Sequence, residues 1–176
     1  IGSDLSCDEW LEVMRRLFSG KLKLIMHDAK ETLVWLMGYG IQPTGIVFDT
    51  CLGAYLLNPA ENTYDLQRVA LSYLNLELPD AEFEKEDAFS PLGGRDSHTQ
   101  QLVKWTIAVQ KLYEEIHSRL EKLPQLKQLY DTLELPLMTV LADMQHIGCK
   151  ADPKRLSEFG EMLDERISAL TEKIFT

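Results

Sequence analysis

The order of its apolar segments constrains the fold of this chain most. Residues 21–26 alternate Lys with apolar side chains and predict a strand, and a helical pattern follows over residues 29–37. Residues 46–48 are a short apolar run that predicts a second strand, and residues 50–57 predict the next helix. A single helix between two strands is the crossover that parallel pairing requires. The order therefore predicts an α/β fold with two parallel strands covered by helices.

Helices dominate the rest of the chain. Apolar residues at helical spacing predict helices over residues 8–18, 65–74, 99–123, 125–147 and from Pro153 onward. Pro136 lies inside one of these segments and predicts a kink or break there. Residues 77–98 are acidic, then rich in Pro and Gly, and are interpreted as a surface loop. The long helix has a set of residues expected to be buried, namely Leu102, Val103, Ile107, Leu112 and Ile116.

Three aspartates stand where helices are expected to begin. Asp28 and Asp49 each follow a predicted strand, and Asp152 precedes Pro153. Aspartate is a preferred N-cap residue, and proline is favoured at the first helical position. Ligands also gather at the carboxyl ends of parallel strands, but a two-metal site needs several converging carboxylates. We therefore interpret all three residues as helix caps.

Composition and charge limit the classes of function. The 18 Lys+Arg against 28 Asp+Glu give a net charge of −10, which argues against a protein that binds DNA with its whole surface but leaves room for a local basic patch. The scattered Cys7, Cys51 and Cys149 indicate a reduced, cytoplasmic protein with the cysteines as small core residues. We expect no membrane partner, because no apolar run is long enough to span a bilayer. The four histidines show no zinc-ligand spacing. The chain opens without Met, so we expect it to be a piece of a longer protein.

Two stretches go beyond composition. Residues 40–50 read Gly-Ile-Gln-Pro-Thr-Gly-Ile-Val-Phe-Asp-Thr, and residues 133–144 read Leu-Glu-Leu-Pro-Leu-Met-Thr-Val-Leu-Ala-Asp-Met, followed by Gly-Cys-Lys-Ala-Asp at 148–152. In this order they resemble the bacterial DNA polymerase I group of family A DNA polymerases. The first stretch is similar to the middle of the 3′–5′ exonuclease domain. The second, which is the more specific, is similar to the passage that opens the polymerase domain at the base of the thumb.

The resemblance covers nearly the whole chain, least around residues 77–98, and implies a fold and a function. It implies an incomplete ribonuclease H-like 3′–5′ exonuclease domain over residues 1–124, helix-dominated and lacking its first strands. Residues 125–176 would begin the polymerase domain with long thumb helices. The parent would be a DNA-directed DNA polymerase, a nucleotidyltransferase of DNA replication and repair that uses Mg²⁺ and binds DNA. For this chain alone we expect no cofactor and no polymerase activity, because the palm aspartates would lie downstream of Thr176.

The resemblance also assigns the proofreading positions. The metal-binding Asp of the family's second motif falls on Thr32, and the Tyr and Asp of its third motif fall on Trp105 and Val109. The first motif, Asp-x-Glu, should lie upstream of Ile1. Valine cannot bind a metal, and threonine is a poor substitute for a carboxylate with hard cations. The resemblance therefore implies an inactive, structural exonuclease domain without a bound metal.

The C-terminal segment carries the expected contacts with partners. Lys150, Lys154 and Arg155 form the best local basic cluster near the start of the thumb, although we expect weak or no DNA binding by this chain alone. The last helix has an apolar stripe, which consists of Leu156, Phe159, Leu163, Ile167, Leu170 and Ile174. A stripe of this size needs an apolar partner. We expect self-association through this helix, or its return onto residues 125–147.

Two other classes of function stay open at this point. One is a non-enzymatic helical protein-interaction module that shares these patterns. The other is an active metal-dependent nuclease that uses non-standard carboxylates, with Asp28, Glu31 and Asp49 as the candidates. Polymerase motifs downstream in the parent reading frame, and a nuclease assay, would separate the three.

Overall fold

The computed structural model describes residues 6–79 and 94–175, with side chains from residue 99 onward in the second range. The chain divides into two compact units, Ile1–His146 and Ile147–Thr176, which are treated separately below. The domain boundary expected between residues 124 and 125 stays a prediction.

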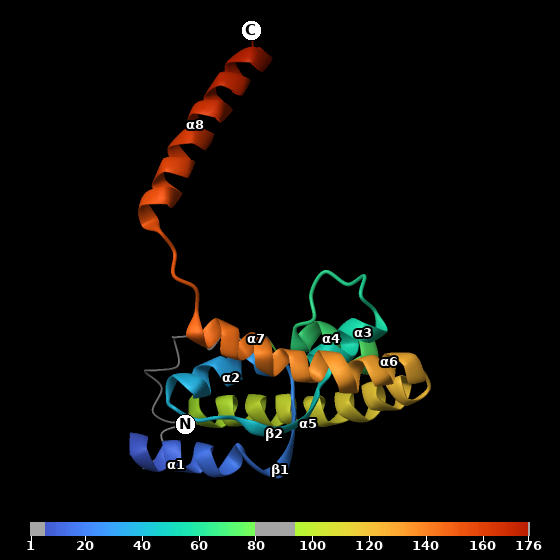
Figure 1. Ribbon diagram of the computed structural model, residues 1–176. Coiled ribbons are helices and arrows are strands. Elements are labelled where there is room, and N and C mark those ends of the chain that lie inside the picture. Colours follow the sequence, from blue (N-terminus) through green and yellow to red (C-terminus); the bar gives the residue numbers. More distant parts are fainter. Residues whose placement is uncertain (1–5, 80–93, 176) are drawn as a thin grey trace. The chain divides into compact units, whose positions relative to one another are not determined.

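Helices make up most of the described chain, as the sequence predicted (Figure 1). The elements are α1 (Cys7–Leu17), β1 (Ser19–Met26), α2 (Ala29–Gly38), β2 (Thr44–Asp49), α3 (Thr50–Leu57), α4 (Leu66–Leu74), α5 (Gly94–Glu121), α6 (Pro124–Leu129), the π-helical turn η2 (Tyr130–Glu134), α7 (Leu135–Ile147) and α8 (Pro153–Phe175). Residues 94–98, expected in a loop, are already helical, and residues 80–93 of that predicted loop lie outside the described part of the chain.

Within the described residues, the sheet consists of β1 and β2, which pair in parallel through the α2 crossover, as predicted. Ile25 pairs with Phe48 and Met26 with Asp49. Toward the start of β1 the register is irregular, because Ser19 pairs with Thr44 while Leu24 pairs with Ile46. Five residue steps on β1 thus match two steps on β2, and the backbone between Ser19 and Leu24 bulges out of the sheet.

The main core lies between α3, α4, α5 and η2. Phe48, Leu112, Ile116 and Tyr130 are buried together there. Two of the five residues predicted to be buried on the long helix therefore are, but Leu102, Val103 and Ile107 are 39–51% exposed. Helical spacing identifies the inward face of a helix, but it does not show how far along the helix the packing partners extend. The N-terminal part of α5 reaches past its partners.

The cysteines do not form part of the core as predicted. Cys7 and Cys149 are exposed, and Cys51 is half-buried. Burial raises the pKa of the Cys51 thiol to about 12. All three are free thiols in the structure.

The break predicted at Pro136 takes the form of η2. Proline has no N–H to bond one turn back, and the turn preceding it widens, with the Leu135 N–H bonding to the Tyr130 carbonyl. The widened turn buries the whole Tyr130 side chain beneath β2. The kink therefore positions a polar aromatic residue in the core.

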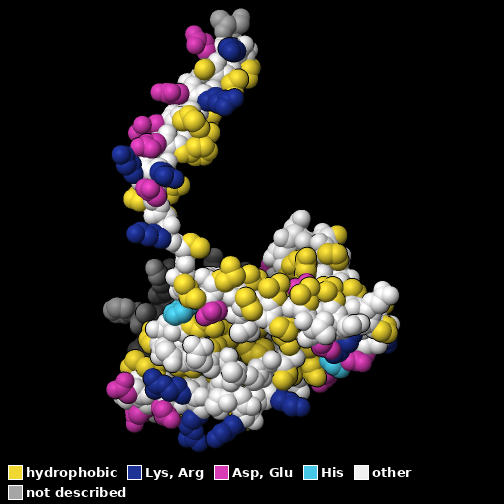
Figure 2. Space-filling view, viewed as in Figure 1, with side chains coloured by type: hydrophobic (Ala, Val, Ile, Leu, Met, Phe, Trp, Pro, Cys, Tyr) yellow, Lys and Arg dark blue, Asp and Glu magenta, His cyan; other side chains and the backbone are white. Residues whose placement is uncertain are grey.

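The second unit is the single helix α8. Asp152 caps it, as predicted, since its Oδ1 accepts the N–H groups of Lys154 at 3.1 Å and Arg155 at 3.3 Å. Figure 2 shows apolar side chains along this helix between charged ones. The six stripe residues from Leu156 to Ile174 are 40–75% exposed. No helix within the described residues is both long and apolar enough to cross a membrane.

Candidate functional site

Two of the three residues that the resemblance assigned to proofreading lie beside a pocket of about 720 Å³ between the end of β1, the start of α4 and α5. Trp105 and Val109, one turn apart on α5, both line it, together with His27 and Glu114. Thr32 is half-buried on α2 and is not among the lining residues. The structure thus brings two of the three predicted positions together and leaves the third elsewhere.

His27 is the titratable group on the β1 side of this pocket. Its Nδ1 lies 2.8 Å from the Thr50 hydroxyl oxygen, which itself lies 3.3 Å from the Met26 carbonyl oxygen. Burial lowers the pKa of His27, and the Asp49 carboxylate opposes that shift. His27 Nε2 and Trp105 Nε1 are buried and have no hydrogen bond of normal geometry from the described residues. The pocket is therefore walled by a neutral imidazole and an indole, with Glu114 as the one carboxylate among its described residues.

Asp49, the last residue of β2, has a structural role. The residue is 1% exposed, and its carboxylate accepts four backbone N–H groups. Oδ1 accepts from Cys51 at 2.8 Å and Leu52 at 3.2 Å, which caps α3 as predicted. It also accepts from Asp28 at 3.3 Å, while Oδ2 accepts from Ala29 at 2.7 Å. One buried carboxylate therefore caps two helices at once.

Asp28 occupies the N-cap position of α2, as predicted, but its side chain does not cap the helix. Asp28 has a φ of 50°, in the left-handed region, and its side chain makes no capping hydrogen bond. The parallel register places Asp49 beside Met26 and hence at the start of α2, so a residue from the neighbouring strand supplies the cap. Because the capping residue comes from a neighbouring strand, the sequence around the start of the helix contains no pattern that predicts it.

Tyr130 completes this arrangement from η2. Its hydroxyl accepts the Asp49 N–H at 2.6 Å and donates to the Asp49 carbonyl at 3.1 Å. Burial raises the pKa of Tyr130 well above its usual range. The tyrosine hydroxyl therefore satisfies both the backbone N–H and the backbone carbonyl of the last residue of β2.

Asp28 and Asp49 also line a small pocket of about 150 Å³, together with Lys30 and Glu134. The Asp49 oxygens already accept backbone hydrogens, and Glu31 lies 3.0 Å from the Lys30 ammonium. Within the described side chains, those of residues 6–79 and 99–175, no group of three His, Cys, Asp or Glu residues is placed to hold a metal. Two of the three carboxylates of the nuclease hypothesis, those of Glu31 and Asp49, are thus engaged in other contacts.

The predicted DNA-binding residues lie at the start of the second unit. Lys150 is exposed in the segment before α8. Lys154 lies 3.8 Å from Glu158, and Arg155 lies 3.7 Å from Asp152. Two of these three charges therefore have a carboxylate nearby, in exposed pairs that contribute little.

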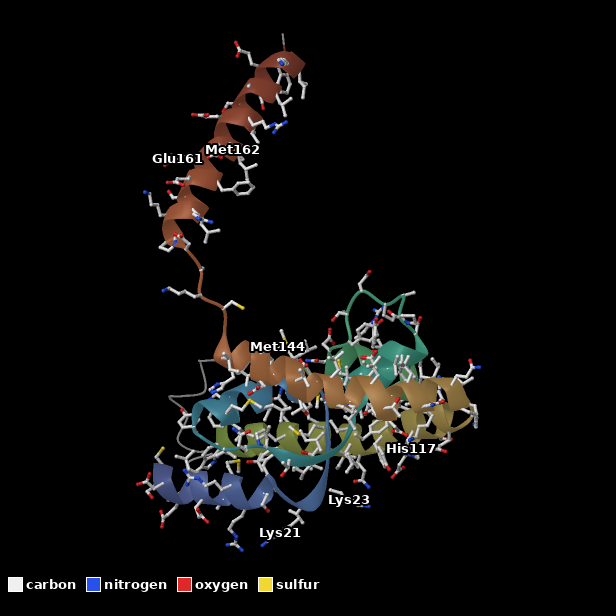
Figure 3. All side chains as sticks on the ribbon, in the orientation of Figure 1. Lys21, Lys23, His117, Met144, Glu161 and Met162 are labelled. Atoms are coloured by element: carbon white, nitrogen blue, oxygen red, sulfur yellow. The ribbon has the colours of Figure 1, made fainter. Side chains whose placement is uncertain are left out.

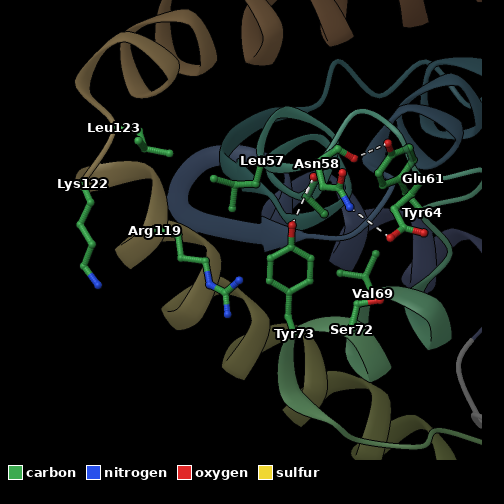
Figure 4. Close-up of a pocket in the computed structure, with 11 residues that line it drawn as sticks. Leu57, Asn58, Glu61, Tyr64, Val69, Ser72, Tyr73, Arg119, Lys122 and Leu123 are labelled. Atoms are coloured by element: carbon green, nitrogen blue, oxygen red, sulfur yellow. Dashed lines mark hydrogen bonds between the residues drawn. The ribbon is translucent and has the colours of Figure 1, made fainter.

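Figure 4 shows a further pocket, of about 570 Å³, at the end of α5. Arg119 lies over the Tyr73 ring at 4.8 Å and is paired with Glu115 at 2.7 Å. Tyr64 donates to the Asn58 carbonyl at 2.7 Å. These polar groups satisfy one another and hold the loop between α3 and α4.

The comparisons with known proteins concern the family of the chain. The family model described as DNA polymerase I, ribonuclease H-like domain, matches residues 4–82. DNA polymerase I of Bacillus subtilis (strain 168) is 32% identical over 167 residues, which cover 94% of this chain and 18% of that protein. DNA polymerase I of Geobacillus stearothermophilus is 34% identical over 155 residues, which cover 87% and 18%.

A solved structure shows the same fold. It is described as the POL domain of Pol1 from M. smegmatis in complex with DNA primer-template and dNTP. The match has a TM-score of 0.74 and 23% identity, and covers 99% of this chain and 28% of that one.

The fold and the family match together define the class of domain that residues 4–82 carry, the ribonuclease H-like domain of DNA polymerase I. Over most of its length the chain is related to bacterial DNA polymerase I, which confirms the resemblance inferred from residues 40–59 and 133–152. The chain spans less than a fifth of the length of these curated relatives.

Proposed function

We propose that this chain is the exonuclease-like region and the start of the polymerase domain of a cytoplasmic DNA-directed DNA polymerase. Its exonuclease-like domain serves as structure and has no catalytic role. The observation that carries the proposal is the identity of the three proofreading positions, which are Thr32, Trp105 and Val109 in a chain related to DNA polymerase I. DNA is the proposed partner of the parent protein, as it is of the solved polymerase complex.

The residues present do not fit the pair of metal ions that the family's exonuclease site holds. Divalent metals of this kind bind carboxylate oxygens, several of which must converge. Val109 offers no ligand atom, and Glu114 is the one carboxylate among the described lining residues. We therefore derive no hydrolytic step at this pocket. The Mg²⁺ of the parent is proposed to belong to its polymerase site.

A nuclease assay on the purified chain tests this proposal. We expect no degradation of single-stranded DNA with Mg²⁺ or Mn²⁺. Introducing two carboxylates with Thr32→Asp and Val109→Asp should still give no activity, because Thr32 does not line the pocket that Val109 lines. Activity that Asp28→Ala or Glu31→Ala abolishes would instead establish the non-standard nuclease. Asp49→Ala does not serve here, because that residue holds the fold.

The exposed stripe on α8 supports a second candidate, a helical interaction module that self-associates. Burying each large apolar side chain contributes on the order of 1.5–3 kcal/mol. Light scattering of the wild type and of Leu163→Asp with Ile167→Asp tests this. Ser157→Asp with Ser168→Asp adds the same charge away from the stripe and is the matched control. Association that only the stripe variant abolishes supports the module, and a monomeric wild type excludes it.

A further inference from the structure

Four cations gather within nine residues at the junction of α1 and β1, in a chain whose net charge is −10. They are Arg15 and Arg16 in the last turn of α1, and Lys21 and Lys23 in the bulge of β1. A shallow pocket of about 580 Å³ lies there, lined by Arg15, Arg16 and Lys21 among others, with Glu12 as the one carboxylate among its described residues. We call these four residues the basic bulge. Its local charge is positive although the chain is acidic.

The bulge is built by the backbone. Gly20 has a φ of 79° and Gly45 a φ of 90°, conformations that favour glycine. A Cβ on Gly45 would lie 2.5 Å from the Leu22 carbonyl oxygen, so β1 crosses β2 closely at this point. The Thr44 N–H and hydroxyl both donate to the Phe18 carbonyl at 2.9 Å, which fixes where the bulge begins. Bulges re-aim side chains, and Figure 3 shows Lys21 and Lys23 at the outer end of β1, directed away from the helices.

These cations remain available for a ligand. Within the described residues, the ion pair of the cluster is Arg15 with Glu12, at 3.8 Å between half-exposed or more exposed side chains. Exposed pairs of this length contribute little. Arg16, Lys21 and Lys23 are exposed, and no ion pair to a described carboxylate holds them. Among the described residues, one of the four cations of the basic bulge has a carboxylate within 4 Å, against two of the three in the cluster of Lys150, Lys154 and Arg155.

We propose that the basic bulge binds the phosphate backbone of duplex DNA. The inference rests on the proposed function, which places the chain in a DNA polymerase. Clustered cations on an acidic protein attract phosphates locally, and lysine and arginine supply sequence-independent backbone contacts. The apolar residues that line the pocket are aliphatic, namely Val13, Leu17 and Leu22. Single-strand binders combine cations with aromatic platforms for base stacking, so the absence of aromatic rings among these lining residues favours duplex DNA.

The test measures how salt weakens binding of the full chain to a short fluorescein-labelled DNA duplex, by anisotropy. Three phosphate contacts give a slope of log K against log salt of about −2.7, which is roughly a 40-fold loss of affinity between 50 and 200 mM salt. Arg16→Gln with Lys21→Gln and Lys23→Gln should remove that slope. Lys104→Gln with Lys111→Gln and Lys122→Gln is the matched control, because both triple variants change the net charge from −10 to −13.

The outcomes separate the possibilities. A slope lost only in the bulge variant supports the proposal. An unchanged slope in the bulge variant overturns it, and so does an equal loss in the bulge and control variants. The proposal also fails if the slope is lost only in the triple variant Lys150→Gln with Lys154→Gln and Arg155→Gln. Tighter binding of a single-stranded oligonucleotide overturns the assignment to duplex DNA. Lys21→Arg with Lys23→Arg keeps the charge and should keep binding, which shows that a loss in the Gln variant reflects charge. DNA degradation in the nuclease assay would contradict the proposed function separately.

Discussion

An aspartate caps a helix in each unit of this chain, but one of the two is buried and the other is exposed. Asp49 is buried in the first unit and accepts four backbone N–H groups from two helices. Asp152 is exposed in the second unit and accepts two N–H groups of its own helix. The first unit is held by buried polar contacts that must all be made together. The second is one helix whose apolar stripe is open to solvent, so a change there should have small effects.

Asp49→Ala should have the largest effect. It leaves four backbone donors without their acceptor, the Ala29 N–H buried and the other three partly buried, and an unsatisfied buried donor costs about 1–3 kcal/mol. We expect a loss of roughly 3–5 kcal/mol in the free energy of unfolding. Asp152→Ala should cost about 1 kcal/mol or less, confined to α8. Urea denaturation with hydrogen exchange by segment measures both, and similar losses would contradict the contrast between the units.

Replacing one glycine in each unit with alanine should change stability in opposite directions. A Cβ at Gly53 would lie 2.6 Å from Ile116 Cγ2 and 3.2 Å from Phe48 Cζ, so Gly53→Ala should destabilise by roughly 1–3 kcal/mol through overpacking. A Cβ at Gly160 meets nothing within 4 Å. Gly160→Ala should therefore stabilise α8 by up to about 1 kcal/mol through helix propensity. Thermal melts report the first change and hydrogen exchange in α8 the second; destabilisation by both would refute the expectation.

The contrast also explains what could be predicted from the sequence. The strands, their parallel pairing and most helices follow from local periodicity, and the Asp152 cap follows from Asp-Pro. The double cap by Asp49 could not be predicted, because it depends on the register of β1 against β2. The exposure of Leu102, Val103 and Ile107 depends on where the partners of α5 end.

The candidate sites show the same limit. Trp105 and Val109 lie on one helix at i and i+4, so their common pocket follows from the sequence. Their separation from Thr32 depends on the tertiary packing of α2 and α5, which the sequence pattern does not show. The basic bulge had a signal in the sequence, four cations from Arg15 to Lys23, but a strand that alternates Lys with Leu predicts a regular edge. Only the five-to-two register shows that the pairing of β1 with β2 is irregular where these lysines lie.

Tyr130→Phe tests the first unit without changing its packing. The variant keeps the ring and removes the hydroxyl that bonds both the Asp49 N–H and the Asp49 carbonyl. We expect a loss of about 1–2 kcal/mol in the free energy of unfolding. Tyr55→Phe is the control, because Tyr55 is 43% exposed, and it should have almost no effect. Equal results for the two variants in urea denaturation would show that the Asp49–Tyr130 contact does not stabilise the unit.

The smallest effect should be a pH dependence confined to the first unit. Burial lowers the pKa of His27, so the folded state binds its proton less readily than the unfolded chain does. Stability is therefore complete above the unfolded pKa, near 6.5, and falls as the pH drops through the lowered value, by at most about 1.4 kcal/mol per pH unit.

Glu9, Glu31 and Asp65 also have lowered pKa values, but carboxylates contribute only below roughly pH 4.5. Between about pH 6.5 and 5, His27→Gln should therefore flatten the pH dependence. Residues 147–176 contain no histidine, so hydrogen exchange in α8, corrected for its intrinsic pH dependence, should not change across that window. A stability that stays level between these pH values in the wild type, or a slope that persists in His27→Gln, would show that His27 is not the group responsible.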